Sequence, residues 1–309
     1  MSNAAGWQHY LFFKKESAWG TGVTPDIYLP FATYDVVAQP EFYKADTFTG
    51  RRQRMHPNVP SRTNVQGQLV CDLYGYQVTS GSLKSVAQHL IDNAVSGGNS
   101  VDQDSFTIEA NDPNDPKRHV GVRVNQLTIA GSHDQSAIKA TLNVMAKQET
   151  GGITPPSLSA STPHYKPFMF ADSIFTISGD ETELRSFELS VENNLQVYHN
   201  NSQWPSIISQ GMRVVGLKFT LFKSANTYDA LRRAMTVTDT TAQLVLKGRH
   251  DGSASQTFTT LTINIDRMNF SAAAEELNIN ELDQQNVDYV VLKPASSDND
   301  IDLTWGTSA

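Results

Sequence analysis

The stretch that decides the fold is Val214-Val215-Gly216-Leu217-Lys218-Phe219-Thr220-Leu221-Phe222. From its second residue to its eighth, large apolar side chains occupy every second position, and Gly, Lys or Thr occupies the positions between. Successive side chains of a strand point to opposite faces, so this order gives one apolar face and one more polar face. The period of two predicts a β-strand that is buried on one side.

The same alternation recurs along the chain. It appears in residues 65–73, 122–129, 138–144, 184–191 and 261–265, with one slip of phase in the second of these runs. Clusters of turn-forming residues, such as Asn-Asp-Pro-Asn-Asp-Pro at 111–116, separate the runs. The chain is therefore predicted to be mainly β.

Two segments follow helical spacing instead. In residues 82–95, apolar side chains fall at the i, i+3, i+4 and i+7 positions that form one face of a helix. A shorter helix is predicted over residues 226–235, with Asn226 as its N-cap. The buried face of this second helix would consist of Tyr228, Leu231 and Met235.

The order of these elements repeats. In the first half, a long polar loop (residues 40–64) leads to a strand, a helix and further strands. In the second half, a long loop (residues 193–213) leads to the strand quoted above, a helix and further strands. This recurrence predicts an internal duplication, and the alternative is that two β-rich halves look alike by chance. The inward positions that would correspond are Leu69 with Phe219 and Cys71 with Leu221.

These elements divide the chain into a first domain (residues 1–150), a linker (151–167), a second domain (168–293) and a C-terminal tail (294–309). The linker is rich in Thr, Ser, Gly and Pro, and we expect it to have no packing role of its own. The tail is polar and acidic, and it is predicted to be an arm or a mobile end.

Composition narrows the class of protein. The 309 residues carry a formal net charge of −8, whereas a protein that grips nucleic acid is normally basic. Cys71 is the only cysteine, so no disulfide forms within the chain, which fits assembly in a reducing cytoplasm. No stretch approaches the roughly 18 apolar residues that a membrane span needs.

Motifs for catalysis or metal binding are missing from the sequence. The eight histidines include no pair at i, i+4 spacing, and neither a Gly-x-Ser-x-Gly elbow nor a P-loop is present. Asp298, Asp300 and Asp302 imitate the first ligands of a calcium loop, but the central Gly and the final Glu are missing. We therefore expect no enzymatic activity, no cofactor and no metal site.

A series of phrases occurs in a characteristic order. The first phrase is Phe13-Lys14-Lys15-Glu16-Ser17-Ala18-Trp19-Gly20-Thr21-Gly22-Val23-Thr24-Pro25. Together these phrases resemble the family of phage tail tube proteins, whose members tend to begin with Lys-Glu-x-x-x-Gly-Thr-x-Val-Thr-Pro. The others are residues 51–54, the strand after Asn64, residues 122–129, 167–171 and 190–195, and the helix after Asn226.

The resemblance implies a β-sandwich or half-barrel with one flanking helix. Combined with the duplication, it predicts a mainly β chain with two tandem tail-tube-like domains, each with one flanking α-helix. One sheet of each domain would line a continuous lumen, and a long loop would reach the adjacent ring. By this analogy, residues 40–64 and 193–213 are stacking loops, and loops longer than about 15 residues usually have a binding role.

Ring size follows from the domain count. Most family members supply one domain per chain and close as hexamers. A chain with two domains would form a trimeric ring with pseudo-sixfold symmetry, and a hexamer is the alternative. Six domains with four lumen strands each, about 4.8 Å apart, give a circumference of roughly 115 Å and a diameter of about 37 Å. A DNA duplex passes through such an opening.

The candidate contacts between rings lie in the two stacking loops. Arg51, Arg52, Arg54 and Arg62 form a basic cluster in the first loop, and Trp204 lies in the second. The cluster could be a DNA site, but the acidic chain favours salt bridges between rings, which would set their register. The acidic rim opposite would include Asp180, Glu181 and Glu183.

The resemblance also implies partners and a location. The partners are further copies of the chain and the tape-measure, tail terminator and tail-tip proteins, in a virion tail assembled in the host cytoplasm. DNA would cross an acidic lumen without specific binding. The alternative function is a carbohydrate-binding β-sandwich that acts as a receptor-binding or decoration protein. Such modules present aromatic platforms, but no predicted strand face gathers Trp7, Trp19, Trp204 and Trp305.

Overall fold

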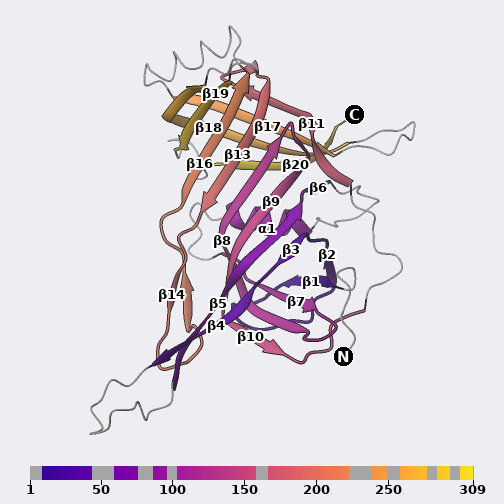
Figure 1. Cartoon of the computed structure of the whole chain (residues 1–309), viewed down its shortest axis with the longest axis vertical. Helices are drawn as coiled ribbons and strands as arrows, with labels where there is room; N and C mark the ends of the chain where they lie inside the picture. Colours follow the sequence, from indigo (N-terminus) through magenta and orange to yellow (C-terminus); the bar gives the residue numbers. More distant parts are fainter. Residues whose placement is uncertain are drawn as a thin grey trace.

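The computed structural model (Figure 1) describes residues 9–43, 59–75, 86–95, 103–157, 166–222, 239–248, 258–276, 284–292 and 300–308. Strands make up nearly all the regular structure of these ranges, so the prediction of a mainly β chain is confirmed. The elements of the first half are β1 (Tyr10–Lys15), β2 (Ile27–Leu29), β3 (Thr33–Tyr34), β4 (Val37–Tyr43), β5 (Val59–Asp72), β6 (Tyr74–Gly75), α1 (Val86–Val95), β7 (Phe106–Asn111), β8 (Lys117–Ser132), β9 (Gln135–Ala146) and β10 (Gln148–Gly151). Those of the second half are β11 (Lys166–Ile177), β12 (Asp180–Glu181), β13 (Leu184–Glu192), β14 (Gln196–Tyr198), β15 (Ile207–Ser209), β16 (Val214–Phe222), β17 (Thr240–Gly248), β18 (Phe258–Glu276), β19 (Gln284–Val291) and β20 (Asp302–Ser308).

One antiparallel sheet runs through both halves. Its strands pair in the order β4–β5–β9–β8–β13–β16–β19–β18, and β8 and β13 join the two halves. Apolar residues at alternate positions of these strands are buried, including Leu69, Leu142, Leu189 and Leu217. The decisive stretch 214–222 is therefore a strand whose apolar side faces the core, as its alternation predicts.

Two long strands carry the chain between layers. The first part of β8 pairs with β7 and β10, and its second part belongs to the large sheet. In the same way, the first part of β18 pairs with β17 and β20, and its second part pairs with β19. The register shifts between Val124 and Gln126 of β8, and between Phe270 and Ala272 of β18. Such bulges bend a strand and let one strand serve two layers.

The strand pairings of the first half recur in the second. The pairs β1–β7, β4–β5, β5–β9, β7–β8, β8–β9 and β8–β10 match the pairs β11–β17, β13–β16, β16–β19, β17–β18, β18–β19 and β18–β20. The matched bulges of β8 and β18 occupy the same place in this scheme. The two halves therefore share one order of pairing.

The first predicted helix is confirmed over its described part. α1 packs on β8 and β2 and buries Leu90, Ile91 and Ala94. Residues 82–85 of the prediction, and the whole second helix predicted over 226–235, lie outside the described residues.

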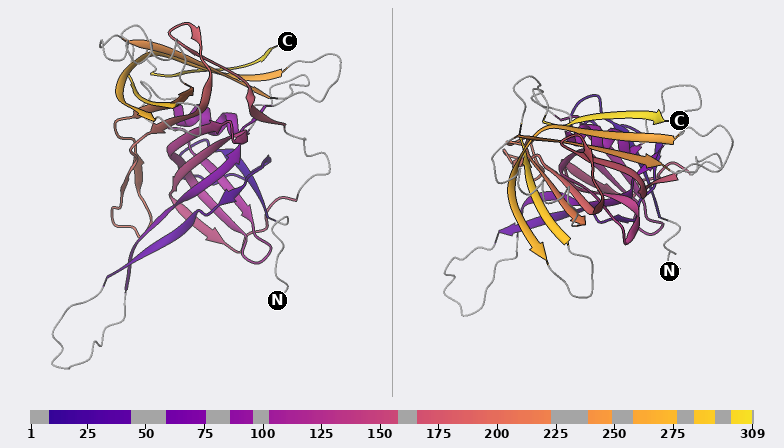
Figure 2. Two further views of the ribbon diagram at one scale, coloured as in Figure 1. Left: turned by 45° about the horizontal axis from the view of Figure 1, so that its top comes forward. Right: turned by 90° about the horizontal axis from the view of Figure 1, so that it is seen from above.

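The prediction of a loop over residues 40–64 is wrong at both ends. Residues 40–43 belong to β4 and residues 59–64 to β5, and the two strands pair and run out from the body together (Figures 1 and 2). This part of the chain looks like a loop in sequence because both faces of a projecting hairpin meet solvent, so no apolar alternation marks it. The second loop, 193–213, likewise contains the small sheet of β14 and β15.

The expected mobile tail is an ordered strand in its last part. β20 pairs with β18 from Asp302 to Ser308, and Ile301 is buried. The Nε1–H of Trp305 donates to Asp92 on α1 at 2.8 Å. The sequence of this segment resembles a mobile tail because the strand has polar residues at its exposed positions. The described ends of the linker are also strand, since Gly151 closes β10 and residues 166–167 open β11.

The phrase at residues 13–25 surrounds a buried carboxylate. Glu16 is 5% exposed and accepts hydrogen bonds from Gly20 N–H (2.8 Å), Ser105 Oγ (2.6 Å), Thr107 Oγ1 (2.8 Å) and Gly121 N–H (2.8 Å). Gly20 adopts a φ of +71°, which a glycine reaches without strain. The phrase therefore has a structural role: it ties the start of the chain to β7 and β8.

Candidate assembly surfaces

The large sheet has a polar face opposite the core. On this face, Gln68 Nε2 donates to Asn143 Oδ1 (3.3 Å), Asn143 Nδ2 to Gln126 Oε1 (2.7 Å), and Gln126 Nε2 to Glu192 Oε1 (3.3 Å). These bonds link β5, β9, β8 and β13 in one row across the junction between the halves. Each side-chain amide of the row therefore has a partner beside it, and the row ends at the carboxylate of Glu192.

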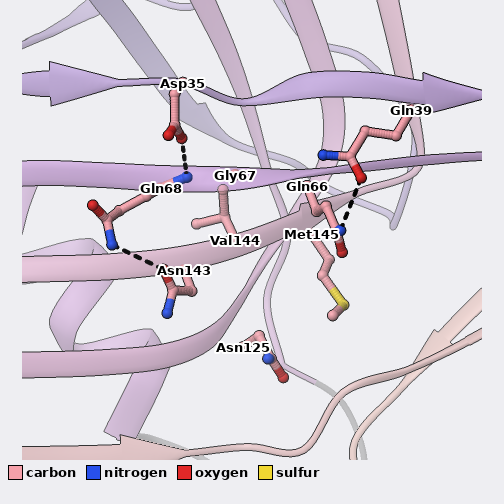
Figure 3. A pocket seen from close by; sticks show the side chains of 9 residues that line it. All are labelled: Asp35, Gln39, Gln66, Gly67, Gln68, Asn125, Asn143, Val144 and Met145. Carbon is pink, nitrogen blue, oxygen red and sulfur yellow. Dashed lines mark hydrogen bonds between the residues drawn. The ribbon is translucent and has the colours of Figure 1, made fainter.

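A shallow hollow lies on this face where β4 and β5 meet (Figure 3). Its volume is about 340 Å³. Gln66 Nε2 donates to Gln39 Oε1 at 3.0 Å, and the carboxylate of Asp35 accepts the backbone N–H of Gln68. A Cβ on Gly67 would lie 2.5 Å from the Cα of Val36, so glycine permits this close crossing. The lining residues are Asp35, Gln39, Gln66, Gly67, Gln68, Asn125, Asn143, Val144 and Met145.

The chemistry of this hollow suits a wetted surface rather than catalysis. Its one carboxylate, Asp35, is already engaged by the backbone, and the lining includes no nucleophile beside a base. Within the described residues, no group of His, Cys, Asp and Glu is arranged to hold a metal ion.

Carboxylates outnumber basic groups among the described side chains of the polar face. Glu192 is exposed, whereas Glu188 meets the ammonium of Lys218 at 3.5 Å. The charged residues of this face lie at the positions that alternate with the buried ones. The acidic residues are Asp35, Glu41, Asp72, Glu188, Glu192 and Asp288, and the basic residues are Arg62, Lys139 and Lys218. This surface would repel phosphate more than it attracts it.

The outer edge of β4 carries a capped donor. Asp35 N–H donates to Gln68 C=O on β5, so the odd positions turn their N–H groups to β5 and the even positions turn theirs outward. Ala38 N–H, on the outer side, donates to Glu149 Oε2 at 2.9 Å. Pro40, the next outward position, has no N–H. Both features block indiscriminate pairing at this edge.

A buried network holds the capping carboxylate. Tyr34 Oη and His119 Nδ1 lie 2.7 Å apart, and His119 Nε2 lies 3.1 Å from Glu149 Oε2. A carboxylate only accepts hydrogen bonds, so Nε2–H of His119 donates to Glu149, and Nδ1 of the same ring bonds with the hydroxyl of Tyr34. The bond from His119 is the main cause that lowers the pKa of Glu149, and Ala38 N–H and Lys117 act in the same direction. Burial raises the pKa of Tyr34 well above its usual range, so Tyr34 keeps its proton.

The predicted contacts between rings are only partly described. Arg51, Arg52 and Arg54 lie outside the described residues. Arg62 is exposed on the projecting part of β5, opposite Glu41 of β4. Trp204 is partly buried and packs against the core, so it is not exposed as Arg62 is. Its segment lies beside β5, because Thr63 N–H donates to Gln203 C=O at 2.8 Å.

Exposed apolar side chains gather on the two hairpins at this end of the molecule. Phe42 and Tyr43 of β4 are 51% and 63% exposed, and Tyr198 and Ile207 of the β14–β15 sheet are 49% and 52% exposed. Figure 1 shows both hairpins at the lower end of the body. Sequence reasoning missed this set because its members come from two segments more than 150 residues apart, and neither segment stands out alone.

The aspartates of the calcium-like run have other roles. Asp300 pairs with the guanidinium of Arg213, whose Nε lies 3.0 Å from Asp300 Oδ2. Asp302 begins β20, and Asp298 lies outside the described residues. An ion pair and a strand therefore occupy the part of this run that is described.

Comparisons with known proteins identify the family. No helix of the described part is long and apolar enough to cross a membrane. A search of the curated proteins found no match. The family model for phage tail tube proteins matches residues 6–281, which cover most of the chain and include every strand of the large sheet except β19. The match, the β-rich fold and the polar sheet face agree, and the chain belongs to the phage tail tube protein family, a family of structural virion proteins.

Proposed function

We propose that this chain is a major tail tube subunit that closes into rings, and that the rings stack into the conduit for DNA ejection. The observation that carries the proposal is the large sheet, buried on one face and polar on the other across both halves of the chain. A tube needs such a sheet, because the outer layers of the subunit cover the apolar face and the polar face lines a water-filled channel.

The recurrence of the pairings supports two tandem tube domains and a ring of three chains. Each chain offers eight strands to the large sheet, β4, β5, β9, β8, β13, β16, β19 and β18. Three chains would supply roughly 24 strands about 4.8 Å apart, which gives a circumference of roughly 115 Å and a diameter of about 37 Å. A duplex fits this opening. A hexamer of chains would double the circumference.

The two ends of the molecule differ in a way that suits stacking. Exposed Phe42, Tyr43 and Arg62 lie on the projecting β4–β5 hairpin. Glu181 and Glu183 are exposed just before β13, whose start lies at the opposite end of the molecule (Figure 1). We propose that the hairpin of one ring meets this acidic rim of the next, with Arg51, Arg52 and Arg54 adding to the basic side.

The remaining partners follow from the same proposal. A tail tip would start the polymer, a tape-measure protein would occupy the lumen and set its length, and a terminator would close the end. DNA would pass without specific binding, because the polar face offers carboxylates rather than a basic track. Assembly would take place in the host cytoplasm, and the product would be the virion tail.

The carbohydrate-binding alternative gains no support from the described tryptophans. The Trp19 ring lies 4.9 Å below the ammonium of Lys147, and its Nε1–H donates to Gly121 C=O at 3.2 Å. Trp204 and Trp305 pack against the core. These three rings serve the fold, and Trp7 lies outside the described residues.

Electron microscopy of the purified protein, with native mass spectrometry, tests the proposal. We expect hollow rings or tubes and a closed species of three 34.1 kDa chains. Dispersed monomers under all assembly conditions would contradict the ring, and rings of six chains would contradict the tandem arrangement. Alanine at Arg62 together with Arg51, Arg52 and Arg54 should weaken stacking and leave single rings intact.

A further inference from the structure

The junction between the two halves is itself a strand-to-strand interface. β8 and β13 pair antiparallel, with Gln126↔Glu192, Leu127↔Val191 and Thr128↔Ser190 in register. The pairing begins beside the bulge of β8, where Asn193 N–H donates to Asn125 C=O at 2.8 Å. Each half thus contributes one edge: the second part of β8, and β13.

The shared order of pairing identifies the counterparts of both edges. β13 pairs with β16 as β4 pairs with β5, so Ser190, Val191 and Glu192 correspond to Val37, Ala38 and Gln39. β18 pairs with β19 as β8 pairs with β9, and the bulges align. Residues 126–128 therefore correspond to residues 272–274.

Both counterpart edges lack a strand neighbour in the described part of the chain. Residues 269–276 of β18 pair with β19 on one side only, and β4 pairs only with β5. The two edges lie at opposite ends of the large sheet (Figure 1), so one chain cannot join them to each other. A second copy of the chain can.

Resting on the ring proposed above, we propose that β4 of one copy pairs antiparallel with the second part of β18 of the next. The register is Val37↔Ala274, Ala38↔Ala273 and Gln39↔Ala272. Ala38 N–H would leave the carboxylate of Glu149 and donate to the carbonyl of Ala273. Pro40 corresponds to Asn193 but lacks its N–H, so the ladder between copies lacks the bond that Asn193 makes within the chain.

Uncovered apolar side chains beside the same interface support a second copy. Within the chain, the segment after β13 covers the start of β5: His199 Nε2 lies 2.9 Å from Asn64 Oδ1. The counterpart of Asn64 is Val214 at the start of β16, which is 42% exposed, and nearby Met212 is 80% exposed. In a ring, the neighbouring copy would supply the cover that the first half receives from the second.

Paired cysteines test the register. Because Ala38 turns its N–H outward, Val37↔Ala274 and Gln39↔Ala272 are non-hydrogen-bonded pairs, whose Cα atoms lie about 4.5 Å apart, within reach of a disulfide. Two chains carry in-register pairs, Val37→Cys with Ala274→Cys and Gln39→Cys with Ala272→Cys. Two matched controls exchange partners, Val37→Cys with Ala272→Cys and Gln39→Cys with Ala274→Cys, which places the thiols at a diagonal of about 7–8 Å. The native Cys71 is buried in all four.

Rings are first counted by microscopy for every variant, then oxidised and run on a denaturing gel. We expect multimers linked by disulfides from both in-register variants, at least tenfold more than from either control. Mixing chains that carry Val37→Cys alone and Ala274→Cys alone should give linked dimers, which places the bond between copies. Rings that form normally but link equally in all four variants, or only in the controls, would overturn the register. Absence of rings from the unsubstituted chain would instead overturn the proposed function.

Discussion

At the scale of single residues, buried carboxylates organise the first half of the chain. Glu16 gathers donors from the N-terminal phrase, β7 and β8, and Glu149 joins His119 to the edge of β4. Neither role could be predicted from the sequence, since every partner except Gly20 lies 30 to 111 positions away from its carboxylate. The phrase around Glu16 signalled a family, but only the fold shows why a carboxylate stands there.

Replacing Glu16 by alanine should destabilise the fold strongly. The change leaves four donors without their acceptor in a buried site, and we expect a loss of about 3–5 kcal/mol in the free energy of unfolding. Glu16→Gln keeps the shape but turns an NH₂ group toward donors, and it should cost about 2 kcal/mol. Urea unfolding measures both. The exposed neighbour Ser17→Ala is the control, and equal effects of all three would contradict the role of Glu16.

The stability that Glu149 contributes should depend on pH. The hydrogen bond from His119, with Ala38 N–H and Lys117, lowers the pKa of Glu149 in the folded state. A lowered pKa means that the contribution is present above the ordinary carboxyl pKa of about 4.3 and is lost as pH falls through the lower folded value. The difference in unfolding free energy between the native chain and Glu149→Gln should therefore shrink from pH 7 to pH 3. Glu183→Gln, at an exposed site, should show a smaller change. A difference that stays constant with pH would refute this account.

At the scale of elements, the sequence predicted the strands and the helix that have a buried apolar face, and it missed the strands and strand ends that have few buried residues. Strands with one buried face, such as β16 and β9, follow from alternation, and α1 follows from its helical stripe. The projecting ends of β4 and β5 and the strand β20 carry polar residues on exposed positions, so their patterns resemble loops. Their backbone pairing with a distant strand, which no local pattern encodes, makes them strands.

The C-terminal strand should contribute to stability, which a mobile tail would not. Trp305 packs near Phe168, with ring centroids 6.3 Å apart, and donates to Asp92. Trp305→Ala should lower the free energy of unfolding by about 2–3 kcal/mol, and Trp305→Phe by about 1 kcal/mol. Thr304→Ala, at the exposed position beside it, should change stability by less than about 0.5 kcal/mol. If Trp305→Ala left the free energy of unfolding unchanged in thermal or urea unfolding, the strand would not contribute to stability and the interpretation as a mobile tail would hold.

At the scale of the whole molecule, one sheet combines both halves and separates two environments. The outer layers of both halves cover the apolar face of the sheet. The polar face has a row of hydrogen-bonded amides and more carboxylates than basic groups. The alternation predicted that such a face exists, but the residues on it could not be assigned to a lumen from one sequence. That assignment depends on how copies join, which the matched edges of β4 and β18 address.

The charge of the polar face should decide whether an assembled tube holds DNA. Glu192→Lys changes the charge by two units per chain on an exposed position of this face, and a ring of three would gain six positive units. Tubes of this variant should retain a short duplex at low salt and release it steeply as salt rises, because bound phosphates release counterions. Fluorescence anisotropy of a labelled duplex at about 50 and 200 mM salt measures retention.

Two controls separate the sign of the charge from its place. Glu192→Gln removes the carboxylate without adding a cation, and its tubes should ignore DNA as the native tubes do. Asp134→Lys makes the same change of charge at the exposed turn between β8 and β9, beyond the row of amides. Because a channel holds a duplex on all sides, the cation on the sheet face should act much more strongly than the cation on the turn. Equal retention by both lysine variants would mean that DNA meets the outside of the tube, and the polar face would not be its lumen.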